Sequence, residues 1–236
     1  MKKSLIALAC MLLLVSTSAF GITLQAGIDT EFVLDRDVNL QNAGVEADYT
    51  AQYYDLTLES KIGLLTLVSK AGLTTSQLSA DVFNTDVDLN SGIGWNIGVD
   101  AQADVYRSKY VDVALIGGYR FSRVDIDEIE IGALSIDNPL ETTLYMHEWE
   151  AGVQVSKNLK EFGIPVIPYF GLVYSDMQGN MDVNLSVIEV EEEIEADKNV
   201  GVRVGFKTEL IPYLTCSVDA KFFDQTAVMG SVSYMF

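Results

Sequence analysis

The last eleven residues, 226–236, constrain the fold of this chain more than any other stretch. Val228, Val232, Tyr234 and Phe236 fall on one face of an extended strand, while small and polar residues occupy the other face. Chain ends that face water are usually polar and loosely held. An apolar strand face that reaches the final residue therefore predicts contact with lipid, where about 9–11 tilted residues cross the core and all backbone groups must pair in a closed barrel.

The first 21 residues predict export from the cytoplasm. Lys2 and Lys3 precede an apolar run over residues 5–15, and small residues follow at 16–21, which is the pattern of a signal peptide. We therefore expect residues 1–21 to be removed and residues 22–236 to form one barrel domain. Removal of the two lysines changes the formal charge from −19 to −21 over the remaining 215 residues.

This composition excludes several classes of protein. Cys216 is the single cysteine after residue 21, so no intrachain disulfide can form and a disulfide-stapled scaffold is excluded. The strongly acidic chain has no basic patch for phosphates, so no nucleic-acid partner is expected. No later run approaches the 18 apolar residues of a membrane helix, so any insertion into a membrane must use strands.

Alternation of apolar and polar residues recurs along the chain and predicts ten strands. The clearest example is residues 93–105, where seven apolar residues alternate with glycine, asparagine, aspartate and glutamine. The slip in alternation at Tyr53 and Tyr54 predicts a β-bulge. The expected strands are 24–34, 45–62, 65–73, 93–105, 111–122, 145–156, 168–175, 200–207, 214–222 and 226–236.

The connections between these strands alternate in length. Four long polar connections, at 36–44, 77–91, 123–142 and 176–198, are predicted to be loops on the outer side, and the last outer link, 223–225, is a short exception. The connections on the other side, at 63–64, 107–109, 157–165 and 210–213, are short. An even strand number with short periplasmic turns and long outer loops is typical of bacterial outer-membrane barrels. The predicted fold is all-β, a transmembrane antiparallel up-and-down β-barrel of about ten strands, with eight strands as the alternative.

Alternation alone does not say which face is wet, so a soluble calyx or sandwich is the competing fold. Three features favour lipid. They are the aromatic C-terminal strand, the glycine-rich polar face, and the aromatic residues at both expected interfaces, with Trp95, Trp149, Tyr145, Tyr119 and Phe32 on the outer side and Tyr213, Tyr106, Phe206, Tyr234 and Phe236 on the periplasmic side.

The C-terminal residues Val228, Val232, Tyr234 and Phe236 resemble the terminal signature of bacterial outer-membrane β-barrels, with Gly230 as the weakest match. The whole pattern is similar to the small barrel group that includes the outer-membrane protein A transmembrane domain and the opacity-type adhesins. The resemblance implies location in the cell outer membrane, contact with lipid and lipopolysaccharide, and a membrane-assembly signal read by the barrel assembly machinery. That group typically has eight strands, whereas the alternation here predicts ten.

The polar face of the strands carries charges of both signs into the expected lumen. They are Lys70, Asp100, Arg120, Glu148, Glu150, Arg203, Lys207, Asp219 and Lys221. One interpretation is a salt-bridged plug, because buried charges must be paired. The alternative is a small cation-preferring porin or channel. Barrels of about eight strands are filled by side chains and those of 16–18 strands leave a channel, which favours the plug and a structural or surface-interaction role.

No catalytic site or cofactor is expected. His147 is the single histidine, and its parity places it on the outward face beside Trp149. No serine stands two positions from it, and that register also disfavours a His–Asp pair in the lumen. We therefore expect a protein that is not an enzyme.

The fourth long connection is strongly acidic. A run of this kind is usually a solvated surface. The alternative is a metal site for hard divalent cations, since clustered carboxylates suit calcium or magnesium, although no defined calcium-loop spacing is present. The candidate ligands are Glu189, Glu191, Glu192, Glu193 and Glu195.

Overall fold

The computed structural model describes residues 22–82, 85–137, 142–184 and 189–236. The predicted signal peptide, residues 1–21, lies outside the described residues. Nearly all the described chain is antiparallel β-structure, and its short 3-10 helix is η1 (Lys160–Phe162). None of the described residues belongs to a helix long and apolar enough to cross a membrane.

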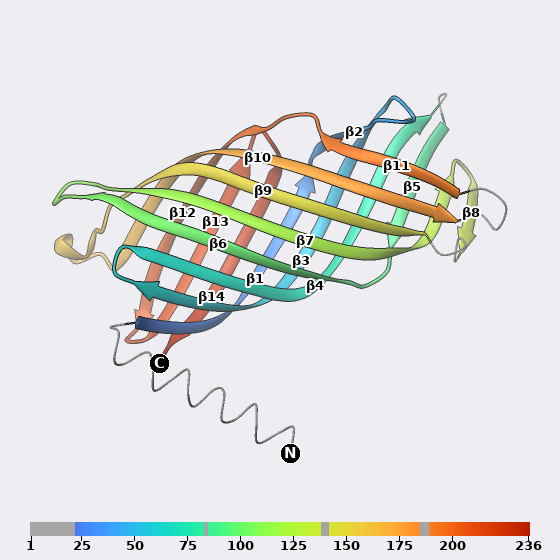
Figure 1. The fold of residues 1–236 in the computed structure, drawn as a ribbon. Helices are drawn as coiled ribbons and strands as arrows, with labels where there is room; N and C mark the ends of the chain where they lie inside the picture. Colours follow the sequence, from blue (N-terminus) through green and yellow to red (C-terminus); the bar gives the residue numbers. More distant parts are fainter. Residues whose placement is uncertain (1–21, 83–84, 138–141, 185–188) are drawn as a thin grey trace, which may run out of the picture.

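Ten long strands form a closed ring, as the alternation predicts (Figure 1). The ring closes where β1 pairs with β14, from Gln25 opposite Met235 to Asp35 opposite Thr226. In order around the barrel the strands are β1 (Ile22–Asp35), β3 (Val45–Ile62), β4 (Leu65–Val82), β6 (Gly94–Arg107), β7 (Asp112–Ile131), β9 (Thr143–Ser156), β10 (Val166–Asn184), β12 (Val200–Ile211), β13 (Leu214–Phe222) and β14 (Thr226–Met235).

Four shorter strands extend the wall beyond this ring at one end, on the right of Figure 1. They are β2 (Asp37–Leu40), β5 (Thr85–Ser91), β8 (Leu134–Asp137) and β11 (Glu189–Ala196). Because the β13–β14 hairpin is short, β11 pairs directly with β2 above it, with Ile194 opposite Leu40 and Ala196 opposite Val38. The described wall therefore narrows from ten strands to eight, in the order β2, β3, β4, β5, β7, β9, β10 and β11.

We call this extended end the projecting half, and the ring of ten strands the membrane half. Segments 36–44, 77–91, 123–142 and 176–198, predicted to be loops, are instead mostly strands of the projecting half. The prediction was wrong because polar residues there lie on the outside of a barrel wall, and an exposed strand face has the same composition as a loop.

The β-bulge predicted at Tyr53 and Tyr54 is also absent. β3 pairs in unbroken register with both neighbours at this point, with Tyr53 opposite Glu31 and Thr74, and Tyr54 opposite Thr30 and Leu73. The alternation continues and the environment changes: Tyr53 is fully buried in the interior, whereas Tyr54 is 45% exposed on the outer surface. The slip in the sequence marks the level at which the apolar face of the strand moves from inside to outside.

Candidate functional site in the barrel interior

A network of paired charges occupies the interior of the membrane half. Arg120, on β7, places its Nη2 atom 2.7 Å from Glu31 Oε2 and 3.8 Å from Asp55 Oδ2. Its guanidinium carbon also lies 3.9 Å from the centre of the Tyr53 ring. One arginine of β7 therefore contacts two acids that lie diagonally across the β1–β3 pair, since Glu31 is opposite Tyr53 and Asp55 is opposite Asp29.

A second group of charges lies beside the first and shares an acid with it. Lys221 Nζ is 2.7 Å from Glu150 Oε2 and 3.9 Å from Glu31 Oε1. Arg203 Nε donates to Asp219 Oδ1 at 2.7 Å, and its Nη1 lies 3.7 Å from Glu150 Oε1. Because Glu150 and Glu31 each contact two cations, the two groups form one continuous network.

Three other predicted lumen charges form ion pairs outside this network. Lys70 Nζ is 2.7 Å from Asp100 Oδ2 and 3.7 Å from Asp29 Oδ2. Lys207 Nζ is 4.0 Å from Glu59 Oε2, and the Lys207 side chain is 41% exposed. This ion pair is therefore longer and more accessible to solvent than the other lumen pairs. Five of the nine predicted residues thus belong to the network: Arg120, Glu150, Arg203, Asp219 and Lys221. Lys70 and Asp100 form a separate group with Asp29, Glu148 pairs with a different cation, and Lys207 lies apart.

Sequence reasoning missed Arg36, which lies in a segment predicted to be a loop. Its side chain is 2% exposed, with Nη1 3.7 Å from Glu148 Oε2 and donating to Gln225 Oε1 at 3.3 Å. Glu148 also accepts a hydrogen bond of 2.6 Å from the Tyr53 hydroxyl. No periodic signal in the sequence marks Arg36, because it stands between two strands, β1 and β2, where the wall bends over the β13–β14 hairpin.

Little free space remains among these charges. The cavity between them, lined by Glu31, Arg36, Arg120 and Glu150, has a volume of about 50 Å³. Room of this size suits one or a few ordered waters. At the level of this network, side chains therefore fill most of the lumen.

A second, apolar filling lies above the charges, inside the projecting half. Strands that carry polar residues inward near the membrane carry apolar residues inward here. The buried set is Val33, Val38, Leu40, Ala47, Tyr49, Ala51, Tyr53, Leu78, Val124, Ile126, Leu144, Met146, Met177, Met181, Ile194 and Ala227. The interior thus changes along the axis from an ion-pair network to a hydrophobic core.

The outer surface changes in the opposite sense. Around the membrane half, large apolar residues point outward on every strand, among them Leu56 at 70% and Ile97 at 51% exposure. Val228, Val232, Tyr234 and Phe236, the predicted assembly signal, also point outward there, at 42–72% exposure. A continuous apolar belt around a barrel with a charged interior is the surface that lipid requires. The chain is therefore built as a membrane-spanning β-barrel.

Aromatic side chains lie on the outer surface at two levels. Near the projecting half, the Trp149 and Tyr174 rings are 5.3 Å apart, and the Tyr119 hydroxyl lies 2.7 Å from His147 Nδ1. At the other end, the Tyr234 and Phe236 rings are 5.5 Å apart. His147 is exposed among these aromatic residues, on the outward face predicted for it.

The acidic residues of β11 do not share one face. Glu192 is 7% exposed and accepts hydrogen bonds from the backbone N–H groups of Asn42 and Ala43, at 2.8 and 3.1 Å. Glu193 and Glu195 are exposed on the opposite face of the strand. Glu189 and Glu191 belong to the same strand, and their side chains lie outside the described set.

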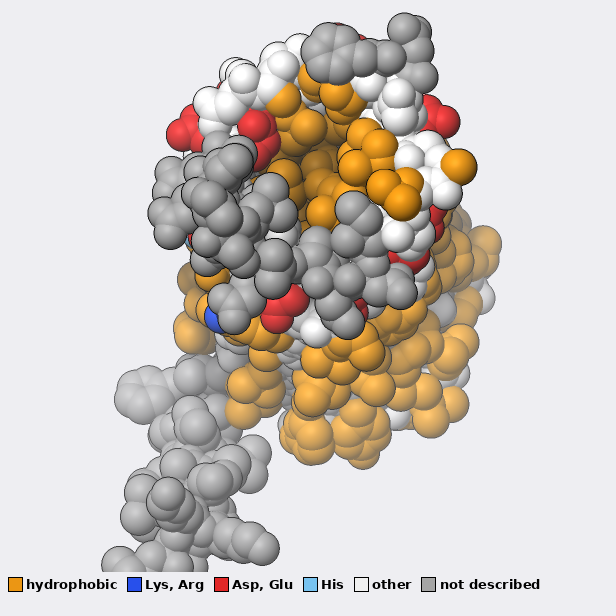
Figure 2. Space-filling view, turned by 90° about the vertical axis from the view of Figure 1, so that its right-hand side faces the viewer, with side chains coloured by type: hydrophobic (Ala, Val, Ile, Leu, Met, Phe, Trp, Pro, Cys, Tyr) orange, Lys and Arg blue, Asp and Glu red, His pale blue; other side chains and the backbone are white. Residues whose placement is uncertain are grey.

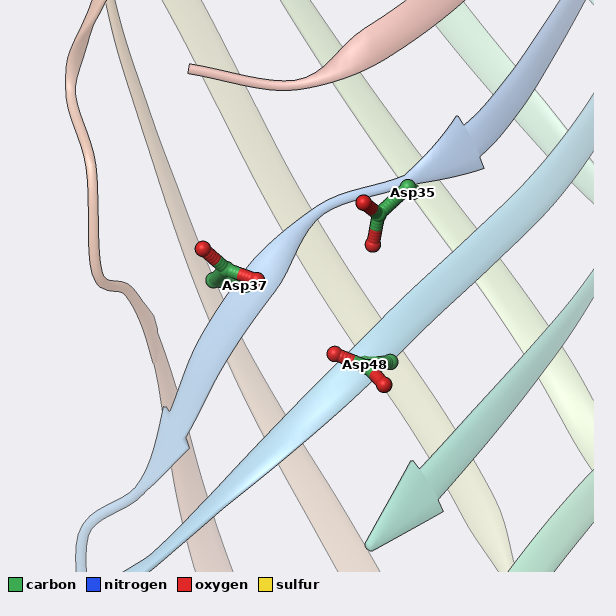
Figure 3. A group of neighbouring side chains, drawn as sticks. All are labelled: Asp35, Asp37 and Asp48. Carbon is green, nitrogen blue, oxygen red and sulfur yellow. The ribbon is translucent and has the colours of Figure 1, made fainter. Parts of the chain in front are cut away.

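Another group of carboxylates gathers on the outer wall of the projecting half. Asp35, Asp37 and Asp48 each place one oxygen within 4.8 Å of the others, at the junction of β1, β2 and β3 (Figure 3). Lys198 forms an ion pair with Asp37, and this hydrogen bond raises the pKa of the Lys198 ammonium. A fixed protein cation thus already compensates part of this charge.

No protein-family model matches the chain, and the search of curated proteins found no match. Among solved structures, the chain is similar to the translocator domain of the autotransporter NalP from Neisseria meningitidis, with 12% identity, 99% and 97% of the two chains covered, and a TM-score of 0.47. It is also similar to the outer membrane protease OmpT from Escherichia coli, with 9% identity, 91% and 95% coverage, and a TM-score of 0.47. The beta domain of the Bordetella autotransporter BrkA gives 9% identity, 91% and 100% coverage, and a TM-score of 0.46. The closed ring and the apolar belt of the chain itself, rather than these similarities, establish a β-barrel of the outer-membrane type.

Proposed function

We propose that this chain is an integral outer-membrane protein that conducts little or no ion current and carries its projecting half into the medium outside the cell. The observation that carries the proposal is the double filling of the barrel. An ion would have to cross both the hydrophobic core and the charge network below it. Five cations of the described residues point into the interior, and each lies within 4 Å of a carboxylate: Arg36, Lys70, Arg120, Arg203 and Lys221.

Unpaired charges inside a protein cost several kcal/mol each, so a network paired in this way resists rearrangement. A structural or surface-interaction role fits such a barrel better than transport. Its proposed partners are outer-membrane lipid, lipopolysaccharide and the barrel assembly machinery. The outer-membrane protein A and opacity group typically has eight strands, whereas this ring has ten. The proposed resemblance to that group therefore rests on the terminal strand.

We propose no catalytic activity. His147 faces outward into the aromatic residues near the lipid boundary, where it hydrogen-bonds to the Tyr119 hydroxyl. A general base needs a reactant within hydrogen-bond reach, and the rings of Tyr119 and Phe121 lie against His147.

The test is conductance in planar lipid bilayers. We expect the purified protein to give no steady current steps, because the two fillings block the axis. Folded insertion is checked beforehand by the mobility difference between heated and unheated samples in SDS gels. A steady cation-preferring current, changed by Arg120→Gln or Arg203→Gln but unchanged by Arg123→Gln on the outer wall, would establish the small-porin alternative and overturn the proposal.

A further inference from the structure

The interior of the projecting half has the dimensions and polarity of a small-ligand calyx. Its described wall has eight strands, and barrels of this size are either filled by side chains or hold one small ligand. Below, the interior is filled, since Tyr53, Met177 and Leu144 are 0–1% exposed. Met146 and Met181 belong to the same core, and methionine side chains adapt easily to a new neighbour.

Towards the open end, the apolar filling stops before the wall does. Ala80, Leu89, Ile129 and Ala196 pack against the core but are only partly buried. Figure 2 looks into this end and shows a hollow lined by hydrophobic side chains inside a rim of polar and acidic ones. The inner wall of the hollow thus offers apolar surface to water, and an apolar molecule seated there would remove it from water.

The charge around the hollow selects between apolar ligands. The described part of the projecting half carries many outward acids and only two exposed cations, Arg123 and Lys198. A potential of one sign at a mouth repels ligands of that sign. The outward acids are Glu46, Asp48, Asp81, Asp86, Asp88, Asp125, Asp127, Asp182, Glu193, Glu195 and Asp197.

We propose that the projecting half binds one small apolar molecule, uncharged or cationic, in the hollow above its hydrophobic core, and excludes anionic molecules of the same shape. This site is independent of whether the barrel conducts. The floor is the apolar core over Tyr53 and Met177, and the wall is made by Ala80, Leu89, Ile129 and Ala196.

Two fluorescent probes with one common apolar body test the proposal. N-phenyl-1-naphthylamine is neutral, and 8-anilino-1-naphthalenesulfonate adds one negative charge. Titration of the full chain in lipid nanodiscs, with empty nanodiscs as background, is expected to give saturable binding of one neutral probe per barrel. The anionic probe is expected to bind at least tenfold more weakly.

Matched variants locate the site. Ala80→Phe fills the hollow from β4 and is expected to weaken binding of the neutral probe at least tenfold. Ser79→Phe, on the outer face of the same strand, is expected to leave it within twofold of the unmodified protein. If Ala80→Phe does not fold, Ala196→Phe with Glu195→Phe as its control makes the same comparison on β11.

Three results would overturn the proposal. The first is no saturable binding of the neutral probe, which would mean that the chain itself fills the hollow. The second is equal binding by the inward variants and their outward controls, which would place the probe in lipid or on the outer wall. The third is equal affinity for the two probes, which would remove the selection by charge.

Discussion

Arg120 illustrates how single residues keep the interior of the membrane half closed. It contacts Glu31 at 2.7 Å, Asp55 at 3.8 Å and the Tyr53 ring, and only 12% of its side chain is exposed. A buried ion pair adds little net stability by itself, but removal of one partner leaves an uncompensated charge. The contribution of Arg120 to stability is therefore measured by replacing Arg120 alone and keeping its acidic partners.

Arg120→Met should lower the free energy of unfolding by about 3–5 kcal/mol, because Glu31 and Asp55 lose their common partner. Arg123→Met is the control: that side chain is 44% exposed and lies 3.8 Å from Asp125, so a change within about 0.5 kcal/mol is expected. Urea titration in detergent or lipid measures both. Equal small losses for the two variants would show that the interior charges are solvated rather than paired.

Glycine leaves room for the large polar groups of the lumen. A Cβ atom added at Gly205 would lie 2.4 Å from Asp219 Cβ and 2.7 Å from the Tyr169 hydroxyl, which donates to Asp219. At Gly230 the nearest atom would be Thr30 Oγ1, at an ordinary 3.7 Å.

Gly205→Ala should therefore destabilise the barrel by about 1–3 kcal/mol through overpacking. Gly230→Ala should change its stability by less than about 0.5 kcal/mol, as surface substitutions usually do. The same urea titrations give both values. An unchanged midpoint for Gly205→Ala would mean that Tyr169 and Asp219 move aside freely and that the lumen is not tightly filled.

At the scale of the element, β3 joins two environments in one unbroken strand. Tyr49 and Tyr53 point into the apolar core of the projecting half, whereas Leu56 and Leu58 point outward into the apolar belt. The alternation has a period of two throughout, so the apolar residues change from odd to even positions where the surroundings change from water to lipid. β3 thus marks the edge of the membrane.

Substitution by lysine on the outer face of β3 locates this edge. Leu58→Lys, in the middle of the outward apolar run from Tyr54 to Ile62, should cost about 2–4 kcal/mol, the cost of a lysine on the lipid face near the bilayer midplane. Gln52→Lys, on the same face of the strand six residues away, should be nearly neutral because Gln52 is exposed to water. Folding yield into liposomes measures the difference, and equal yields would place the boundary elsewhere.

The sequence predicts these elements unevenly. β6 and β14 lie wholly in the membrane half, where one face is apolar and the other polar, so their alternation predicts them directly. The sequence predicts loops at the upper parts of β4, β7 and β10, because their outward residues are acidic. Their inward residues, such as Ala80 and Met181, can be recognised as a core only once the pairing of the strands is known. The strand number follows from the alternation, but the narrowing from ten strands to eight depends on the pairing of β2 with β11.

The residues of the candidate site are likewise predicted only in part. The ion-pair residues could be predicted, since each stands on the polar face of a strand, although the sequence does not say which acid pairs with which base. Arg36 could not be predicted, because it lies at a bend between strands. The change of alternation at Tyr53 and Tyr54 predicts a β-bulge, because an inserted residue would give the same pattern as a core that begins at this level.

At the scale of the whole molecule, the polar and apolar faces of the barrel wall exchange sides once along the barrel axis. The membrane half is charged within and apolar without, and the projecting half is apolar within and polar without. The two halves share β3, β4, β7, β9 and β10, so their wall is continuous. The C-terminal strand β14 closes the membrane half against β1, which makes the terminal residues part of the lipid-facing belt.

Labelling of single cysteines along β3 tests this inversion most directly. Cys216, on the outer face of β13, is first replaced by serine. Asp48→Cys and Leu56→Cys then place one thiol each on the outer face of β3, above and below the proposed edge. In proteoliposomes, we predict that a membrane-impermeant maleimide modifies the thiol at position 48 rapidly and leaves the one at position 56 unmodified until the protein is denatured. Equally rapid modification at both positions would contradict the account, because water would then cover the face assigned to lipid.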